Sequence, residues 1–520
     1  MRVAVIGAGI GGLAAAARLA QAGLDVTVLE RARTPGGKMR SLDVGGLAVE
    51  AGPTVLTMRW VFEELFRDCG ADLGARVRLS PARLLARHAW EDGARLDLFA
   101  DIDASVDAIR AFAGPREAEG YRRFCARSRE VYETLEGPFI RDDRPSAVDL
   151  ALRIGPWGLP RLWRIQPFAT LWSALAEDFR DPRLRQLFAR YATYCGSSPF
   201  EAPATLMLVA HVEQAGVWTV DGGLSALARA VADLAAERGA RLRYGAEVAR
   251  LAVSGGRVAG VDLADGERVP ADAVVCNADA AALGAGLLGP EARPAGERLE
   301  PYERSLSAVT LCARATVSGF PLAHHTVFFA PDYRAEFDQI LRERRLPEAP
   351  TIYVCAQDRD DACAGPDGPE PRPERLLLLV NAPADGPERP TPPEIERCAT
   401  NLRTRLAAFG LSLTEAEPPA TTGPAEFAAL FPGTMGALYG RASRGSTATF
   451  RRPGARSTLP GLYLAGGSVH PGPGVPMAAL SGGLAARAIL NDHRSALADH
   501  RSASTARSRG AAMSGGTSMP

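Results

Sequence analysis

The chain has 520 residues, more than one compact hydrophobic core usually serves, so two or more lobes are expected. Its 60 basic residues balance 60 acidic ones, which gives no indication of nucleic acid or another polyanion as a partner. Eight cysteines without C-x-x-C pairs or metal-ligand spacing predict neither a metal site nor a disulfide framework, and they fit a reducing cytosol.

The beginning of the chain does not have the pattern of a secretory signal. Only Arg2 precedes the first apolar run, and glycines interrupt that run at once. No stretch of about 20 uninterrupted apolar residues occurs in the sequence. We therefore expect a cytoplasmic protein without a membrane-spanning segment, which leaves peripheral contact with a membrane open.

The first 30 residues predict a strand, a glycine turn, a helix and a second strand. Residues 3–6 are a short apolar run of the buried-strand type, residues 13–22 are rich in alanine and leucine, and residues 26–29 form the next apolar run. The turn fits the G-x-G-x-x-G pattern of dinucleotide-binding folds, and Glu30 ends the second strand. The predicted phosphate-binding turn comprises Gly7, Gly9, Ile10, Gly11 and Gly12.

There is a physical reason why each of these positions requires glycine. Gly7 permits the tight turn, Gly9 lets the backbone approach a pyrophosphate, and Gly12 lets the helix pack closely on the strand. The helix N-terminus offers free N–H groups to the phosphates, and Glu30 offers a carboxylate to the ribose hydroxyls. These residues predict a dinucleotide site but do not distinguish FAD from NAD.

A second glycine loop follows directly after the acidic residue. It contains Arg31 and then Gly36, Gly37, Lys38 and Met39. Two adjacent glycines let a loop pass close to the pyrophosphate, and the basic side chains supply positive charge. This segment resembles the E-R-x4-G-G-x3-S extension of the flavin amine-oxidase and phytoene-desaturase superfamily, which implies FAD. The chain has no second G-x-G-x-x-G of this quality, so a separate NAD(P)H domain is not expected.

The rest of the chain predicts alternating helical and sheet regions. Residues 56–215 are mostly helical in pattern, residues 216–290 return to an α/β pattern, and residues 300–430 mix strands with a polar insert. Residues 455–492 predict a strand, a glycine-rich turn and a helix. Beyond about residue 494, a composition rich in serine, alanine, arginine and glycine predicts a disordered tail.

Three further segments resemble the carotenoid desaturases within this superfamily. The first is a [DE]-x-G-P-[ST] element that begins at Glu50, the second begins a helix at residues 222–223 and leads to two strands, and the third is the glycine- and proline-rich stretch 461–476. In the family these segments lie along the adenine and the flavin. The resemblance therefore implies cofactor contacts for Gly52, Pro53, Thr54, Val248, Asn277, Gly466, Gly467, Val475, Pro476 and Met477.

Within the family, four segments are similar to the 1-hydroxycarotenoid 3,4-desaturases, namely residues 52–59, 353–359, 437–443 and 466–477. The resemblance implies an enzyme of carotenoid biosynthesis that transfers a hydride to FAD. It would introduce a 3,4 double bond into a 1-hydroxylated acyclic carotenoid such as 1-hydroxyneurosporene, with oxygen or a quinone as the electron acceptor. Residues 444–446 depart from the family, because Arg-Gly-Ser stands where a His-Gly-Trp-like sequence is expected, and this departure bears on the preferred end group.

The implied fold belongs to the α/β class. It combines a Rossmann-type FAD-binding domain with a helical, membrane-facing lobe and a mixed-sheet substrate domain, and the chain is expected to enter the FAD-binding domain three times. The predicted FAD-binding parts are 1–75, 216–295 and 441–494; the other parts are 76–215 for the helical substrate lobe, 296–440 for the substrate domain and 495–520 for the tail.

A carotenoid dissolved in a bilayer requires an apolar tunnel and an opening that faces the membrane. Residues 151–190 contain seven arginines against three acids, together with six tryptophan and phenylalanine residues. Arginines with aromatics suit a peripheral segment on anionic lipid, at the cytoplasmic face of the inner or photosynthetic membrane. A buried helical lobe with a solvated arginine face explains the same pattern.

Removing a hydride beside a polyene needs no strong base, because the developing positive charge spreads along the conjugation. His470 and Glu50 are the candidate catalytic residues, as polar groups near the flavin. The alternative for His470 is a turn histidine satisfied by the backbone, and the alternative for Glu50 is an internal partner of Arg40 or Arg31. The pair His324-His325 has no third ligand in the sequence pattern and is interpreted as structural or exposed.

Other functions share this fold. Another carotenoid desaturase or a carotene cis–trans isomerase would use the same cofactor, and a flavin amine oxidase would share the first 55 residues in outline. A prenyl-binding chaperone would reuse the fold without redox chemistry, and the retained flavin loops argue against it. The pattern at residues 470–472 favours carotenoids over amines.

Overall fold

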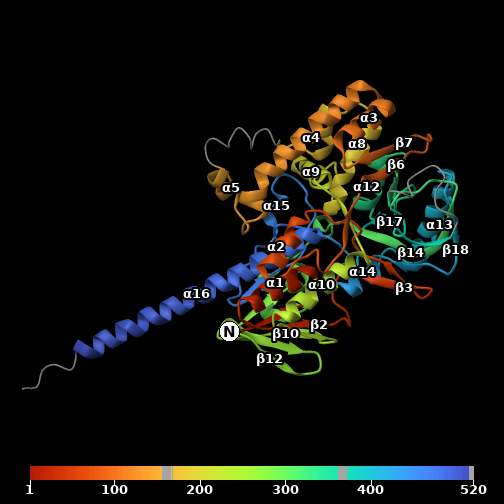
Figure 1. Cartoon of the computed structure of the whole chain (residues 1–520). Helices are drawn as coiled ribbons and strands as arrows, with labels where there is room; N and C mark the ends of the chain where they lie inside the picture. The colour runs from red at the N-terminus through yellow and green to blue at the C-terminus, as the bar shows by residue number, and fades with distance from the viewer. Residues whose placement is uncertain (155–165, 167, 361–371, 514–520) are drawn as a thin grey trace, which may run out of the picture.

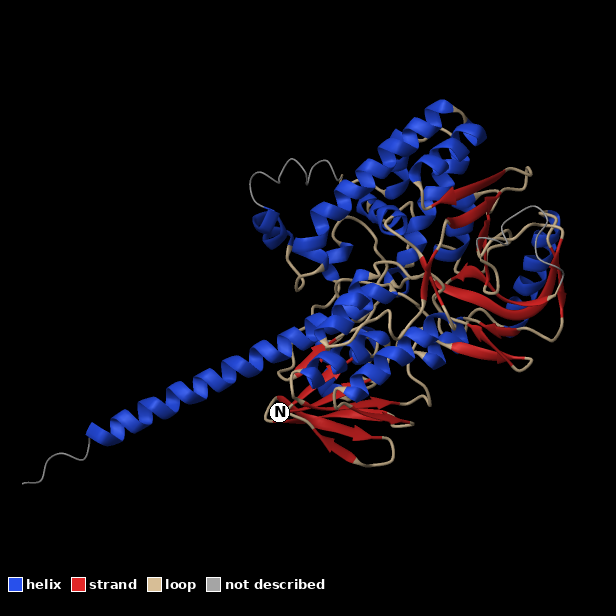
Figure 2. Cartoon of the chain, viewed as in Figure 1, coloured by secondary structure: helices blue, strands red, loops and turns tan. Residues whose placement is uncertain are grey.

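The computed structural model describes residues 1–154, 166, 168–360 and 372–513. The chain forms a parallel sheet, a larger mixed sheet and a helical lobe (Figure 1). Helices gather at the lobe and around the parallel sheet, while the strands of the mixed sheet lie together on one side of the molecule (Figure 2). The α/β class predicted from the sequence is confirmed.

The parallel sheet has five strands in the order β20-β13-β1-β2-β9. All neighbouring strands in it run parallel. Three segments that are far apart in the sequence therefore build one sheet. The strands are Arg2–Ile6 (β1), Asp25–Glu30 (β2), Arg241–Tyr244 (β9), Ala273–Cys276 (β13) and Leu462–Leu464 (β20).

Four strands of the parallel sheet, β1, β2, β13 and β20, are buried on both faces, which explains why they are largely apolar runs, whereas the edge strand β9 is partly exposed and carries two arginines. Val3 and Val5 face the helices, whereas Ala4 and Ile6 face a three-stranded antiparallel sheet, in the alternation that a strand requires. The helices are Ile10–Gln21 (α1), Gly223–Glu237 (α10) and Val475–Met513 (α16), and the three strands are Val248–Ser254 (β10), Arg257–Leu263 (β11) and Arg268–Pro270 (β12).

The larger sheet has the strand order β18-β14-β17-β16-β15-β6-β7, with β19 paired to β14. Its pairs are antiparallel except for β15 with β6. Helix α13 (Pro392–Ala408) covers one face through Cys398, Leu402 and Leu406. The strands are Leu84–Ala89 (β6), Arg95–Phe99 (β7), Ser307–Ser318 (β14), His325–Phe328 (β15), Ile352–Ala356 (β16), Pro373–Ala382 (β17), Ser412–Glu415 (β18) and Ala420–Thr422 (β19).

The helical lobe lies next to β6 and β7 (Figure 1). An aromatic cluster of Tyr121, Phe124, Phe179 and Phe188 holds its helices together. Its helices and those beside it are Trp60–Asp68 (α2), Ile102–Ala113 (α3), Pro115–Leu135 (α4), Ala147–Ile154 (α5), Leu171–Asp178 (α7), Pro182–Ala189 (α8), Leu208–Gln214 (α9) and Tyr333–Leu341 (α12). Smaller elements elsewhere are Ser41–Val44 (β3), Leu47–Glu50 (β4), Leu79–Pro81 (β5), Trp218–Val220 (β8), Ala280–Gly284 (α11), Pro424–Leu430 (α14) and Ala448–Arg451 (α15).

Two expectations differ from the structure. The mostly helical region 56–215 also contains strands, and β6 with β7 joins the larger sheet. Every residue of β6 is buried, so the sequence there lacks the alternation that marks a half-exposed strand. The tail expected to be disordered from residue 495 instead continues α16 to Met513, because alanine and arginine favour helix. Figure 1 shows this part of α16 leaving the body of the molecule.

Some predictions fall on residues outside the described part. These are positions 155–165 and 167 of the arginine- and aromatic-rich segment, and positions 361–371 of the polar insert. Among the described residues, no helix combines the length and the apolar composition needed to cross a bilayer.

Candidate active site

A cavity of about 990 Å³ lies where the parallel sheet, the larger sheet and the helical lobe meet. Apolar side chains of the lobe, including Leu135, Ile140 and Val212, line one part of its wall. Apart from Gly12, the cofactor residues predicted from the sequence line the same cavity: Gly7, Gly9, Ile10, Gly11, Glu30, Arg31, Gly36, Gly37, Lys38, Met39, Gly52, Pro53, Thr54, Val248, Asn277, Gly466, Gly467, Val475, Pro476 and Met477.

The glycine turn after β1 is packed too tightly for side chains. Gly7 has a φ of +92°, which favours glycine. A Cβ on Gly9 would lie 2.6 Å from Asn277 Nδ2, and one on Gly11 would lie 2.7 Å from Asn277 Oδ1. A Cβ on Gly12 would meet the Gly7 carbonyl oxygen at 2.3 Å, so Gly12 serves the turn itself rather than the cavity wall. The turn therefore presents bare backbone to the cavity, as a pyrophosphate requires.

Glu30 is held beside this turn by two backbone donors. Its carboxylate accepts hydrogen bonds from the Ala8 N–H at 2.7 Å and from the Ala32 N–H at 2.8 Å. Two N–H groups leave lone pairs on a carboxylate for further donors. Because Glu30 also lines the cavity, its remaining lone pairs suit the ribose hydroxyls of an adenosine.

The second glycine loop lies on the first. The Gly36 N–H donates to the Ala8 carbonyl at 2.9 Å, and a Cβ on Gly37 would lie 3.3 Å from the Gly9 Cα. The loop at residues 52–54 packs on the second loop in turn, because a Cβ on Gly52 would lie 1.9 Å from the Lys38 carbonyl oxygen. Three backbone loops therefore line this wall without intervening side chains, and the cradle fits FAD.

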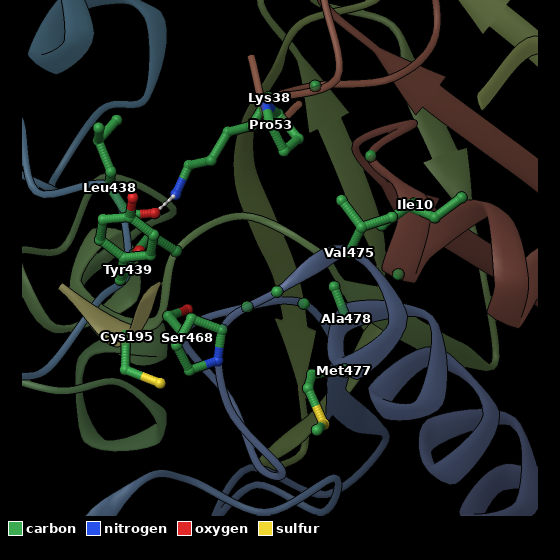
Figure 3. A pocket seen from close by; sticks show the side chains of 18 of the residues that line it. Ile10, Lys38, Pro53, Cys195, Leu438, Tyr439, Ser468, Val475, Met477 and Ala478 are labelled. Atoms are coloured by element: carbon green, nitrogen blue, oxygen red, sulfur yellow. Dashed lines mark hydrogen bonds between the residues drawn. The ribbon is translucent and has the colours of Figure 1, made fainter. Parts of the chain in front are cut away.

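The two basic residues of the second loop reach across the cavity wall. Arg31 donates to the carbonyl groups of Ala429 and Leu430. Lys38 donates to the Leu438 carbonyl, as Figure 3 shows, and its Nζ lies 5.3 Å from the centre of the Phe431 ring. Burial lowers the pKa of Lys38. Both cations thus fasten the cofactor loop to residues 429–438, which carry part of the substrate side of the wall.

The C-terminal glycine loop closes the cavity from the side of α16. Gly466 has a φ of +115°, and a Cβ there would lie 3.0 Å from Asn277 Oδ1. Val475, Met477 and Ala478 lie at the first turn of α16 beside the cavity (Figure 3). The positive end of the helix dipole therefore faces the space where the family holds the flavin ring.

His470 does not line the cavity. It is buried, and its Nε2–H donates to the carbonyl groups of Phe139 at 2.8 Å and Asp142 at 3.0 Å. Burial lowers the pKa of its imidazole, partly offset by these bonds. The side chain thus ties the C-terminal loop to residues 139–142, which agrees with the alternative of a histidine satisfied by the backbone. The geometry gives no support to a catalytic role for His470.

Glu50 is also directed away from the cavity. It accepts hydrogen bonds from the Ser225 N–H at 3.0 Å and the Ser225 hydroxyl at 2.5 Å, at the beginning of α10. A carboxylate at a helix N-terminus is stabilised by the free N–H groups and the helix dipole. Neither of the partners considered from the sequence pairs with it, because Arg40 donates to Thr422 and Arg31 to backbone carbonyls. The geometry supports a structural role for Glu50.

The structure adds a third polar group to the histidine pair. Cys355 Sγ lies 3.7 Å from His324 Nε2, and β15–β16 pairing places Cys355 opposite His325. The Nδ1 atom of His324 contacts the Arg359 carbonyl at 2.7 Å. The sequence missed this cluster because Cys355 is separated from the histidines by the whole of α12. The absence of a metal stays a prediction.

Three polar residues of the cavity wall, Arg190, Tyr194 and Glu213, were not found from the sequence. Glu213 accepts hydrogen bonds from the hydroxyls of Tyr191 and Tyr194, and burial raises its pKa. Arg190 lies over the rings of Tyr194 and Tyr353, at 5.4 and 5.3 Å from their centres. Arg190 and Tyr194 lie in the short 3-10 helix Arg190–Cys195, Glu213 lies in α9, and none of them carries a motif. The only signal was the arginine- and aromatic-rich segment that ends at Arg190.

Arg452 is a further residue of the site that no sequence motif marks. Its side chain is almost fully buried and donates to the carbonyls of Tyr439, Arg441 and Gly467. It therefore fastens the C-terminal glycine loop to residues 439–441. Residues 444–446, which depart from the family sequence, lie partly outside the cavity. Arg444 does not line it, and its guanidinium pairs with Glu201 at 3.0 Å. Ser446 does line the cavity.

Comparison with known proteins agrees with this geometry. The family described as flavin containing amine oxidoreductase matches residues 10–490. The hydroxyneurosporene desaturase of Rubrivivax gelatinosus is 52% identical over 99% of this chain and 97% of its own length. That of Cereibacter sphaeroides is 48% identical over 94% of this chain and 98% of its own length.

A solved structure shows the same fold at low sequence identity. Putrescine oxidase bound to putrescine superposes with a TM-score of 0.59 at 15% identity, covering 94% of this chain and 99% of the oxidase. The two desaturases cover nearly the whole chain at high identity, and the family match includes strands from all three segments of the parallel sheet. The chain therefore belongs to the flavin containing amine oxidoreductase family and, within it, to the carotenoid desaturases, and it is an FAD-dependent oxidoreductase.

Proposed function

We propose that this chain introduces the 3,4 double bond into a 1-hydroxylated acyclic carotenoid, such as 1-hydroxyneurosporene, in carotenoid biosynthesis. The observation that carries the proposal is the shape of the wall. Bare backbone loops on the cofactor side continue into an apolar surface from the helical lobe, with a few polar groups between them. The identity to two hydroxyneurosporene desaturases supports the same substrate class.

The cofactor residues divide into those for the adenosine half and those for the flavin half. Glu30 and the glycine turns would hold the ribose and the pyrophosphate, and Gly466, Gly467 and the start of α16 would hold the flavin. When bound, FAD supplies a hydride acceptor. This division also supports the proposed boundaries, with residues 1–75, 216–295 and 441–494 in the FAD-binding domain, because the parallel strands come from these ranges.

The polypeptide contributes positioning and the exclusion of water. Leu135, Ile140 and Val212 present an apolar surface on which a polyene packs without unsatisfied polar groups. The hydrogen that leaves as hydride is allylic, so the positive charge left behind spreads along the polyene, and the neighbouring C–H becomes acidic. A weak acceptor then suffices for the proton, which agrees with the placement of His470 and Glu50 away from the cavity.

We further propose that the cavity opens toward the surface of a membrane at α5. Val148 and Leu152 on this helix are 68% and 74% exposed, and Phe168 is 76% exposed. Leu150, between the first two, and Phe168 also line the cavity. Exposed apolar side chains next to an apolar cavity suit contact with lipid. The carotenoid would pass from a bilayer into the cavity here, and oxygen or a membrane quinone would take the electrons from the reduced cofactor.

The test is a reaction with a single substrate. FAD-loaded protein is incubated with liposomes containing 1-hydroxyneurosporene and with a quinone or oxygen. The proposal predicts a red-shifted carotenoid that is lighter by two hydrogens. A product of unchanged mass would instead make the chain a carotene isomerase.

A further inference from the structure

A short chain of hydrogen bonds crosses the cavity wall beside the cofactor loops. The Thr54 hydroxyl lies 2.6 Å from the Tyr353 hydroxyl, which lies 2.7 Å from Nδ1 of His325. Thr54 and Tyr353 line the cavity, whereas His325 is buried behind them. Nε2 of His325 is buried without a hydrogen-bond partner in the described part of the chain. The series of hydrogen bonds therefore ends at His325 on its buried side and at Thr54 on the side that faces the cavity.

The outer end keeps an open hydrogen-bonding position whichever tautomer His325 adopts. If Nδ1 accepts from Tyr353, the Tyr353 oxygen accepts from Thr54, and the Thr54 oxygen is free to accept from a ligand. If Nδ1–H donates to Tyr353, the Tyr353 hydroxyl donates to Thr54, and the Thr54 hydroxyl is free to donate. In both cases a ligand that carries one hydroxyl group completes the chain.

Arg190 adds a charge next to this position. Its guanidinium lies over the ring of Tyr353, and it lines the cavity. Tyr194 and the charge of Glu213 keep the pKa of Arg190 raised in spite of its burial, so the guanidinium stays charged beside this position. Its N–H groups are donors that suit the oxygen of a bound polar group.

The position also agrees with the chemistry of the proposed substrate. A hydroxyl oxygen on C1 is three bonds from C3 and four bonds from C4, a span of about 4 to 5 Å because tetrahedral angles shorten the advance per bond to roughly 1.25 Å. A group that binds this hydroxyl must therefore lie next to the cofactor. Thr54 follows Gly52 and Pro53 in the loop that packs on the Lys38 backbone, and it lines the same cavity as the C-terminal glycine loop.

We propose that Thr54 and Tyr353 form a binding subsite for the tertiary hydroxyl of the substrate's end group, with His325 behind them and Arg190 beside them. The inference rests on the proposed function and assigns the recognition of its substrate. Hydroxyl groups left unpaired in an apolar cavity cost binding free energy, so the subsite would disfavour a carotenoid that lacks the hydroxyl.

The experiment compares two isosteric variants with a matched control. Tyr353→Phe and Thr54→Val each remove one hydroxyl of the subsite. Tyr333→Phe removes another hydroxyl from the same cavity, one that has no hydrogen-bond partner among the described residues. For each FAD-loaded protein, kcat/KM is measured with 1-hydroxyneurosporene and with neurosporene, which differ at the end group. Binding of both carotenoids is also measured by quenching of tryptophan fluorescence.

We expect each subsite variant to lower the preference for the hydroxylated carotenoid about tenfold in kcat/KM and in binding, while Tyr333→Phe leaves it unchanged. An unchanged preference in both subsite variants, or an equal fall in the control, would overturn the inference. If the parent protein already shows no preference for 1-hydroxyneurosporene, the proposed function fails instead. If one of the two variants does not bind FAD, the other decides the question.

Discussion

Contacts of very different range along the chain hold the residues around the cavity in place: Glu30 accepts hydrogen bonds from nearby backbone N–H groups, whereas His470 and Glu50 have distant partners. The glycine turn and Glu30 follow from a pattern within the first 30 residues, and the structure places them on one cavity wall. The roles of His470 and Glu50 were not predictable, because their partners are far away in the sequence. His470 contacts Phe139, 331 residues away, and Glu50 contacts Ser225, 175 residues away. Proximity to a family motif placed both residues near the site but gave no information on which way they point.

His88 gives a prediction for the dependence of stability on pH. It is buried in β6, its Nδ1–H donates to the Leu96 carbonyl, and burial, with the charge of Arg190, lowers its pKa to about 3. In the unfolded chain the pKa is about 6.5, so below that value the unfolded state takes up a proton that the folded state does not. The stability that depends on neutral His88 is present above pH 6.5 and is lost as the pH falls toward 3.

The measurement compares His88→Gln with the parent protein by urea unfolding at about pH 7.5 and about pH 5. The glutamine amide keeps a donor for Leu96 but does not titrate. At about pH 5, protonation of His88 in the unfolded chain lowers the free energy of unfolding of the parent protein by roughly 2 kcal/mol relative to about pH 7.5. The variant lacks this contribution, so we expect its free energy of unfolding to fall by roughly 2 kcal/mol less than that of the parent. Equal pH dependence in both proteins would contradict the assignment.

At the scale of elements, α1 and α16 show what a pattern predicts and what it does not. Both helices were expected, since each follows an apolar strand and a glycine turn. Their mutual packing was not expected, because it depends on one glycine in α16. A Cβ on Gly482 would lie 2.0 Å from the Gly11 carbonyl oxygen, so α16 rests directly on the phosphate-binding turn. The neighbouring Gly483 faces only the end of the Arg18 side chain.

Gly482→Ala and Gly483→Ala form a matched pair. Both gain up to about 1 kcal/mol of helix propensity, but only Gly482→Ala forces α16 away from the turn, at a cost of about 1–3 kcal/mol. We expect Gly482→Ala to lower the thermal midpoint and to weaken FAD binding, measured by flavin fluorescence. Gly483→Ala should bind FAD normally and unfold at the same or a slightly higher temperature. The same response in both variants would show that α16 does not rest on the turn.

Helix α5 gives a prediction for membrane contact. The double variant Val148→Ser, Leu152→Ser removes apolar surface from its exposed face. The control, Leu47→Ser with Tyr302→Ser, removes exposed apolar surface elsewhere; Leu47 lies in the β3–β4 hairpin, on the far side of the molecule from α5 (Figure 1). Because each buried apolar side chain contributes about 1.5–3 kcal/mol, we expect at least about tenfold weaker binding to liposomes for the α5 variant alone.

Two results would argue against a membrane-facing α5. One is liposome binding that stays unchanged in the α5 variant. The other is an equal loss in the control, which would indicate general stickiness of exposed apolar residues. Activity on detergent-dispersed carotenoid should stay the same in both proteins, because neither pair changes the cofactor loops.

At the scale of the whole molecule, the chain passes through the parallel sheet in three separate segments, and a single cavity joins them to the helical lobe. The parallel sheet was predictable because four of its strands are largely apolar runs next to turn residues, and glycines at positions 239 and 245 mark the two sides of β9. The larger sheet was only partly predictable. Its β6 pairs with β15 across more than 200 residues, as in Thr326 with Arg87, and such pairing leaves no mark in a local pattern. The residues of the cavity wall opposite the cofactor loops could therefore be identified only from the structure.

The central claim is that this cavity passes two hydrogens from a hydroxylated carotenoid to a bound flavin. Anaerobic mixing of FAD-loaded protein with 1-hydroxyneurosporene in liposomes tests it directly, with the flavin absorbance and the carotenoid mass followed in one sample. We predict bleaching of the oxidised flavin in equal amount to a carotenoid that is lighter by two hydrogens. Flavin that stays oxidised while the carotenoid is unchanged or merely isomerised would contradict the claim.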